Sequence, residues 1–137
     1  MSVRPRTIAA LAAAMTLGTT AAGIGAAAAA APGPRPSINK TASCTKGSLA
    51  NLQAQREDTG KLSVDVGVDM SRHASGVPWK VKVTDNGKTL ANATVRTISD
   101  GSFSITRTLK PIAGKNHIVF TATNLRTGER CVMNGTV

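Results

Sequence analysis

The sequence has no tyrosine, and its 137 residues include only one tryptophan, two phenylalanines, two cysteines and two histidines. So few aromatic rings leave little material for a sugar-stacking platform or an apolar ligand pocket. Two histidines also provide few candidates for a general base. The length fits one domain and is short for an enzyme with a separate cofactor domain. The composition therefore favours a small noncatalytic domain over an enzyme.

The sequence also lacks the motifs that mark many catalytic and metal sites. It contains no GxSxG, HExxH, P-loop or CxxC pattern. His73 lies in a polar loop segment and His117 begins an apolar strand pattern, and an enzyme would require an acid beside His73 in the fold. Asp65 and Asp69 share one strand face but are about 13 Å apart, too far for the carboxylate pair of a retaining glycosidase. We expect no catalytic residue, no metal and no cofactor.

The first thirty residues show the three zones of a secretory signal peptide. Arg4 and Arg6 form a basic start, residues 7–24 are apolar and rich in alanine, and residues 26–31 are all alanine. We expect cleavage after Ala30, and a retained membrane anchor is the alternative. Removal of residues 1–30 leaves 15 of the 17 basic residues against 7 acidic ones, a net charge of +8. The polyalanine leader predicts a bacterial secreted protein without a transmembrane span after cleavage.

The two cysteines, Cys44 and Cys131, allow a single pairing. Oxidising conditions outside the cytosol favour a disulfide between them. Such a bridge would close a loop that holds nearly the whole secreted chain, which the chain-entropy account values at about 4–5 kcal/mol. A reactive thiol or half of a metal site is the alternative, but no neighbouring histidine or second pair supports it. We therefore predict a structural disulfide.

Apolar residues recur at every second position through most of the chain after residue 44. The clearest segment is 62–70, where Leu62, Val64 and Val66 alternate with polar residues. The Asn-Gly pair at 86–87 is a strong hairpin signal, and other glycine-containing turns separate the remaining segments. Seven short strands predict an all-β fold, a β-sandwich with an open barrel as the alternative. The predicted strands cover residues 50–55, 62–70, 77–84, 90–97, 103–109, 118–122 and 130–137.

The segment between the leader and Cys44 has a different composition. Pro32, Pro34 and Pro36 alternate with other residues, which favours an extended and poorly ordered arm. The sequence therefore divides into a signal peptide (1–30), a proline-rich flexible arm (31–43) and one β-sandwich domain (44–137).

Trp79 and two segments that contain glycine turns give a further indication of the type of sandwich. Trp79 falls in the third predicted strand, where immunoglobulin-like domains often carry a buried tryptophan. Residues 83–95 and 100–105 contain a glycine turn, then L-A-x-A-x-V, then D-G-x-F. This pattern resembles bacterial immunoglobulin-like and carboxypeptidase-regulatory-like modules. The resemblance implies a seven-stranded immunoglobulin-like or fibronectin III-like sandwich that acts as a spacer, an adhesion unit or a binding domain. The disulfide departs from the antibody pattern, because Cys44 precedes the first predicted strand and Cys131 lies in the last.

Basic residues form a candidate contact patch on two predicted strands. Lys80 and Lys82 lie on the polar face of one strand, Lys88 follows the adjacent turn, and Arg96 lies on the next strand. If these strands pair, the four cations can share one face and attract an anionic partner. The alternative is that they only keep a small β domain soluble and protect its edges. Further positive charge is expected towards the other end of the domain, from Arg107, Lys110, Lys115, Arg126 and Arg130.

We therefore expect a noncatalytic, secreted or cell-envelope-associated immunoglobulin-like module with Trp79, Phe103 and Phe120 in its core. The expected partner is an anionic cell-wall polymer or another envelope protein. Nucleic acid is not expected, since stacking of bases requires exposed aromatic rings. We expect a monomer. The alternative functions are a small-ligand carrier with a cavity beside Trp79, and a secreted protein inhibitor that presents residues 71–78 as a rigid loop.

Overall fold

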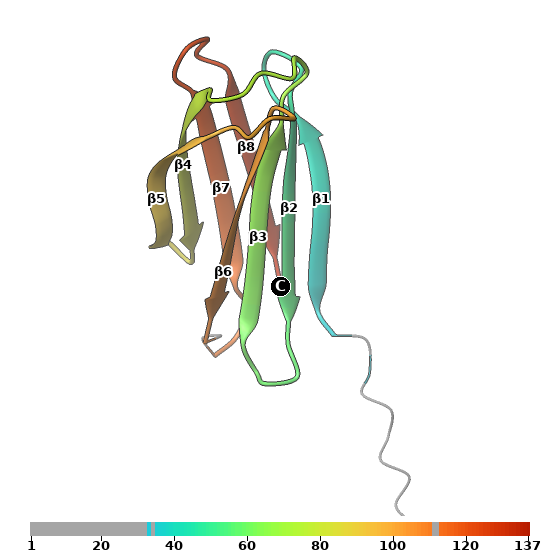
Figure 1. Cartoon of the computed structure of the whole chain (residues 1–137). Coiled ribbons are helices and arrows are strands. Elements are labelled where there is room, and N and C mark those ends of the chain that lie inside the picture. The colour runs from blue at the N-terminus through green and yellow to red at the C-terminus, as the bar shows by residue number, and fades with distance from the viewer. Residues whose placement is uncertain (1–32, 34, 111–112) are drawn as a thin grey trace, which may run out of the picture. The chain divides into compact units, whose positions relative to one another are not determined.

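The computed structural model describes residue 33 and residues 35–110 and 113–137, so the predicted signal peptide lies outside the described residues. The described chain is all-β and contains eight strands, one more than predicted (Figure 1). All seven predicted strands are present, with ends that differ by at most two residues. No helix in the described ranges is long and apolar enough to cross a membrane. The strands are β1 (Ser37–Ser43), β2 (Leu49–Arg56), β3 (Leu62–Asp69), β4 (Pro78–Asp85), β5 (Lys88–Arg96), β6 (Ser102–Leu109), β7 (His117–Asn124) and β8 (Arg130–Thr136).

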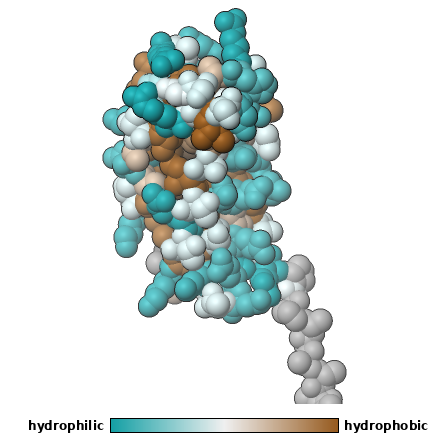
Figure 2. All heavy atoms as spheres, viewed as in Figure 1, coloured by the Kyte–Doolittle hydropathy of each residue, from teal (hydrophilic) through white to brown (hydrophobic). Residues whose placement is uncertain are grey.

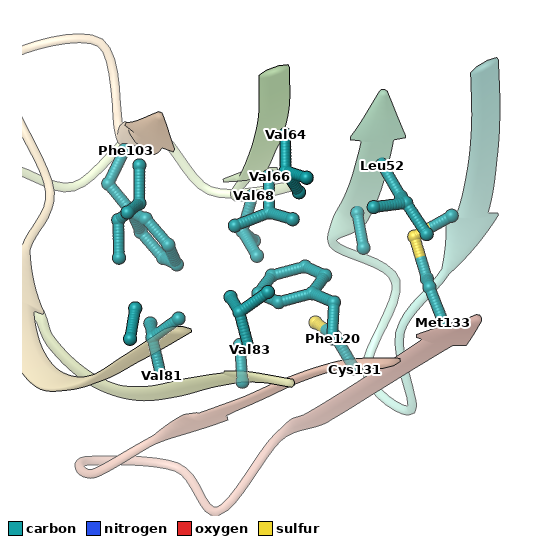
Figure 3. Close-up of a cluster of buried hydrophobic side chains, with 14 of the residues drawn as sticks. Leu52, Val64, Val66, Val68, Val81, Val83, Phe103, Phe120, Cys131 and Met133 are labelled. Atoms are coloured by element: carbon teal, nitrogen blue, oxygen red, sulfur yellow. The ribbon is translucent and has the colours of Figure 1, made fainter. Parts of the chain in front are cut away.

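The strands form two antiparallel four-stranded sheets, in the orders β1-β2-β3-β6 and β5-β4-β7-β8. The chain crosses from one sheet to the other after β3, after β5 and after β6. As a result β3 pairs with β6 and β4 pairs with β7, although neither pair is consecutive in the sequence. The sheets pack face to face around a shared core (Figures 1 and 3), which makes the fold a β-sandwich and not an open barrel.

The eighth strand, β1, corrects the expectation that residues 31–43 form a flexible arm. Ser37–Ser43 pairs with β2 along its whole length, and Ile38 and Ala42 pack against the core. Lys40 occupies the inward position between these two residues, so the apolar alternation was too weak to reveal a strand. Its Nζ atom donates a hydrogen bond of 2.9 Å to the backbone oxygen of Asn134 in β8. The sandwich therefore begins at Ser37 and not at Cys44.

Alternating side chains from both sheets fill the core (Figure 3). Val64, Val66 and Val68 of β3 face Val81 and Val83 of β4, and each of them is at most 2% exposed. Complete burial of an aliphatic side chain contributes about 1.5–3 kcal/mol, so this layer provides the main driving force for folding. The largest fully buried hydrophobic side chains are those of Trp79, Phe120, Leu52, Leu62 and Ile118.

The predicted core position of the aromatic residues is confirmed. Trp79 and Phe120 are fully buried, and Phe103 is 7% exposed. The ring centroids of Trp79 and Phe103 are 5.8 Å apart and the rings are tilted by 51°. An aromatic pair of this geometry adds about 0.5–1.5 kcal/mol beyond its buried area. Because Trp79 belongs to β4 and Phe103 to β6, the pair also holds the two sheets together.

The predicted disulfide is also confirmed, with 4.5 Å between the Cα atoms of Cys44 and Cys131. Cys44 follows β1 in one sheet and Cys131 belongs to β8 in the other, so the bridge joins the two sheets along one edge. Beside it, the Thr45 amide donates to the backbone oxygen of Arg130 (3.0 Å), and the Arg130 amide donates to Thr45 Oγ1 (2.9 Å). The covalent bond and these hydrogen bonds close this edge of the sandwich.

A buried carboxylate supports the same end of the molecule. Glu129 is 4% exposed, and its Oε1 atom accepts hydrogen bonds from the amides of Ser48 (2.9 Å) and Lys46 (3.1 Å). Its Oε2 atom accepts a third bond, from Ser48 Oγ (2.9 Å). These donors compensate for the removal of the carboxylate from water, so Glu129 orders the turn between β1 and β2.

At the opposite edge of the sandwich, some apolar side chains are exposed to solvent. β5 and β6 are edge strands that do not pair with each other. Figure 2 shows a narrow hydrophobic strip between them on a surface that is otherwise mostly hydrophilic. Leu90, Val95 and Leu109 are partly buried against the core, and Ile98 is 60% exposed. The strip is the open side of the core and lies on a different surface from the charged residues described next.

Candidate functional site

The outer face of the sheet β5-β4-β7-β8 carries four exposed cations, which we call the basic face: Lys80, Lys82, Arg96 and Arg130. Lys80 and Lys82 point outward because the alternate residues of β4 are buried in the core. Pro78 of β4 lies opposite Arg96 of β5, and paired residues point to the same side of a sheet. The strand register therefore brings three of the four predicted patch residues onto one face.

Lys88, the fourth residue of the predicted patch, lies apart from the other three. It is paired with Asp85 just after the turn formed by Asn86 and Gly87, at the opposite end of β5 from Arg96. Both turn residues have positive φ angles, +47° and +82°, as a two-residue hairpin of this type requires. Lys88 is exposed, but it adds charge to the end of the hairpin and not to the basic face.

Two arginines expected at the other end of the domain lie elsewhere: Arg130 is part of the basic face, and Arg126 lies next to it. Arg130 is on β8, in line with Lys80 and two strands away from it. Arg126 is in the turn between β7 and β8, and its Nη2 atom is 3.5 Å from the backbone oxygen of Gly76. The same oxygen accepts a 2.9 Å hydrogen bond from Nη1 of Arg96. Sequence separation concealed this arrangement, because β4 pairs with a strand that is distant in the chain.

No carboxylate points outward from the described strands of this sheet. Asp85 of β4 is buried and accepts a 2.7 Å hydrogen bond from Asn116 Nδ2, and Glu129 is buried as described above. Among the described residues the only ion pair joins Arg35 to Asp58, near the other sheet. The charges of the basic face are therefore not neutralised by the protein. They attract anions over about 8–10 Å at moderate ionic strength.

Small polar side chains lie between the cations. Thr94 is the cross-strand neighbour of Lys80, and Asn92 and Thr121 lie on either side of Lys82. Hydroxyl and amide groups can donate hydrogen bonds to an oxyanion that the lysines attract. The basic face thus combines unpaired positive charge with neutral hydrogen-bond donors.

The outer face of the other sheet has the opposite charge. On the described strands, Asp65 and Asp69 of β3 are the charged residues that point outward, and the register surrounds them mainly with serine, threonine, asparagine and glutamine side chains. Thr106 Oγ1 donates a 3.2 Å hydrogen bond to Asp65 Oδ2. No lysine or arginine points outward from the described strands of this sheet. The two faces of the sandwich therefore differ in sign, and an anionic ligand is directed to the basic face.

His73 lies near Asp100 and Ser102, but these three residues are not arranged as a Ser–His–Asp relay. Its Nδ1 atom is 2.7 Å from the backbone oxygen of Asp100. Ser102 donates to Asp100 Oδ1 through its hydroxyl (2.6 Å) and its amide (2.9 Å). The hydrogen bond from the Ser102 hydroxyl, and to a lesser extent the one from the Ser102 amide, lower the pKa of the Asp100 carboxyl below its ordinary value. In a relay the histidine stands between serine and acid, whereas here the serine contacts the acid directly.

Neither His117 nor any group of metal-binding side chains forms a further candidate catalytic or metal site in the part of the chain that the structure describes. His117 Nδ1 is 3.2 Å from Thr136 Oγ1, on the outer face of the second sheet. No three or more histidine, cysteine, aspartate or glutamate side chains of the described chain come together in a way that could hold a metal ion.

Comparison of the sequence with known proteins does not assign it to a family. No protein-family model matches the chain, and no curated protein matches it. The geometry and charge of the basic face are therefore the basis for inferring a function.

Proposed function

We propose that this protein is a noncatalytic, secreted or cell-envelope-associated module that binds an anionic cell-wall polymer through the basic face. The observation that carries the proposal is the clustering of Lys80, Lys82, Arg96 and Arg130 on one sheet face without an outward carboxylate. Uncompensated charge of one sign favours association with a polyanion, and the affinity decreases as salt increases.

The sandwich belongs, in this proposal, to the immunoglobulin-like or fibronectin III-like type. Repeated crossing between two antiparallel sheets is typical of the Greek-key connections in such domains. A buried tryptophan on β4 is a second shared feature. β1 is then an added edge strand, and the disulfide joins the sheet edges instead of the inner strands.

Secretion is supported by the leader sequence and by the bridge between Cys44 and Cys131. Disulfides persist in oxidising compartments, and they are rare in the cytosol. The polymers available to a secreted bacterial protein at the envelope include anionic wall polymers, so the charge of the basic face suits the proposed location.

The basic face suits an extended polymer better than a small ligand. Its cations are distributed over three strands, so a polymer can contact several of them at once and gain from multivalency. The small-ligand carrier requires a cavity beside Trp79, but this ring is fully buried and packs against Phe103. Buried aromatic rings likewise offer no platform for nucleic-acid bases.

The proposal is tested by charge reversal on the basic face. The variant K80E/K82E is expected to bind purified anionic wall polymer at least about tenfold more weakly than the parent at low salt, which corresponds to about 1.4 kcal/mol. The matched control is K61E/K110E, which changes the net charge equally at two exposed positions outside the basic face. Binding is measured by sedimentation with insoluble wall polymer over a series of salt concentrations.

Equal loss of binding in both double variants would show that only net charge matters. Unchanged binding of K80E/K82E at low salt would show that the polymer does not contact the basic face. Either result contradicts the proposed site.

A further inference from the structure

Two guanidinium groups converge on one backbone oxygen at the end of the basic face. Arg96 Nη1 and Arg126 Nη2 lie 2.9 Å and 3.5 Å from the backbone oxygen of Gly76. Both arginines are exposed, and neither has a carboxylate partner within the described chain. Two positive charges are therefore held within a few ångströms of each other. Each guanidinium has five N–H groups, so most of these donors are free to bind a ligand.

Backbone contacts from three connections hold the pair in place. The amide of Gly76, in the connection between β3 and β4, donates a 2.8 Å hydrogen bond to the backbone oxygen of Thr97, next to Arg96. The amide of Arg126 donates a 2.9 Å bond to Oδ1 of Asn124, whose side chain is fully buried. The meeting of the two arginines thus follows from ordered backbone as well as from the reach of two long side chains.

We propose that Arg96 and Arg126 form a phosphate clamp, and that the polymer bound by the basic face is a polyphosphodiester; this inference rests on the proposed function. The oxygens of a phosphate point in tetrahedral directions, so two guanidinium forks in different planes can bind one phosphate together. The two oxygens of a carboxylate lie in one plane, and a single fork satisfies them. Two converging arginines therefore select phosphate over carboxylate.

The lysines of the basic face extend this selection to a repeating polymer. Lys80 and Lys82 continue from the clamp along β4 in steps of about 7 Å, the separation of alternate residues in a strand. A polymer of phosphate groups joined by short polyols can place successive charges on the clamp, on Lys80 and on Lys82. This row of cations favours a linear polymer over an isolated phosphate or a single lipid headgroup.

The test compares two soluble probes with the same number of charges, poly(glycerol phosphate) and polyglutamate, at about 50 mM salt. The parent protein is expected to bind the phosphate probe about tenfold more tightly. The variant R96K/R126K keeps both charges but loses both forks, so the preference for phosphate is expected to disappear. The matched control R107K changes an exposed arginine on the other sheet and is expected to keep the preference.

A second measurement locates the binding site. Inorganic phosphate is expected to shift the NMR signals of the Nε–H groups of Arg96 and Arg126 and to leave that of Arg107 in place. Thermal unfolding of each variant establishes that it is folded before binding is measured.

The outcomes separate the clamp from the proposed function. If the parent binds both probes equally, or if R96K/R126K keeps the preference, the clamp is wrong and the proposed function stands. If the parent binds neither probe at low salt, both the phosphate clamp and the proposed binding of an anionic wall polymer are wrong. Tighter binding to a single-stranded DNA oligomer of equal charge, or to phosphatidylglycerol vesicles, would overturn the wall polymer as the source of the phosphate.

Discussion

At the scale of single residues, the buried carboxylate of Glu129 joins the start of β8 to the turn between β1 and β2. Three donors from Lys46 and Ser48 point at its carboxylate, and a glutamine amide can offer them one oxygen instead of two. We expect Glu129→Gln to lower the free energy of unfolding by about 1–3 kcal/mol, because at least one buried donor loses its acceptor. The measurement is urea unfolding at neutral pH, followed by the fluorescence of Trp79.

The matched control for this prediction is Glu57→Gln at an exposed position. It removes the same charge and is expected to change the stability by less than about 0.5 kcal/mol. Equal unfolding midpoints for the two variants would show that the hydrogen bonds of Glu129 contribute no net stability.

The sequence predicts which face of a strand a side chain occupies wherever apolar and polar residues alternate clearly. The alternation of Lys80 and Lys82 with Val81 and Val83 predicts that the two lysines point away from the core. The burial of Glu129 could not be predicted in this way, because its partners on the turn after β1 are more than 80 residues away. A charged side chain also gives no local signal that distinguishes a buried acceptor from an exposed one.

At the scale of elements, Gly101 shows how two connections are fitted together. Its φ angle is +80°, and an added Cβ atom would lie 2.7 Å from the Cα atom of His73 and 2.9 Å from the amide nitrogen of Ala74. The backbone oxygen of Gly101 also accepts a 3.1 Å hydrogen bond from the Met70 amide. The connections β3–β4 and β5–β6 can therefore approach each other only when this residue has no side chain.

We expect Gly101→Ala to destabilise the fold clearly more than Gly87→Ala. Both glycines have positive φ, so each substitution costs about 1–2 kcal/mol from backbone conformation. Only at Gly101 must two backbone segments also separate, because nothing lies within 4 Å of a Cβ atom at Gly87. Calorimetric melting of the two variants provides the comparison, and equal melting temperatures would contradict the close approach.

Seven of the eight strands could be predicted from the sequence, and β1 could not. Seven strands were found because hydrophobic alternation and glycine turns are local signals. β1 was missed because Lys40 interrupts its alternation and three prolines precede it. Its pairing with β2 and the reach of Lys40 to β8 are tertiary contacts, so its strand character depends on neighbours that a short sequence window does not contain.

At the scale of the whole molecule, the disulfide restricts nearly the entire chain. Cys44 and Cys131 are 87 residues apart, so the bridge removes a large share of the conformational freedom of the unfolded state. We expect the double variant C44A/C131A to lose about 2–5 kcal/mol of stability. The measurement is urea unfolding of the variant beside the oxidised and the reduced parent.

The reduced parent is the control for the loss of packing at the two alanines. It is expected to unfold at nearly the same urea concentration as C44A/C131A. An unfolding midpoint of the reduced parent that equals that of the oxidised protein would show that the bridge does not stabilise the sandwich.

Local signals in the sequence were sufficient to predict the all-β class, most of the strands, the aromatic core and the pairing of the two cysteines. These properties follow from local periodicity and from a cysteine count that allows one solution. The alignment of Arg130 with Lys80, and the approach of Arg96 and Arg126 to Gly76, result from the order of the strands in the sheet and from contacts between loops. The reason is physical: backbone hydrogen bonding joins strands that are far apart in the chain, and the local pattern that makes a strand does not specify its partner.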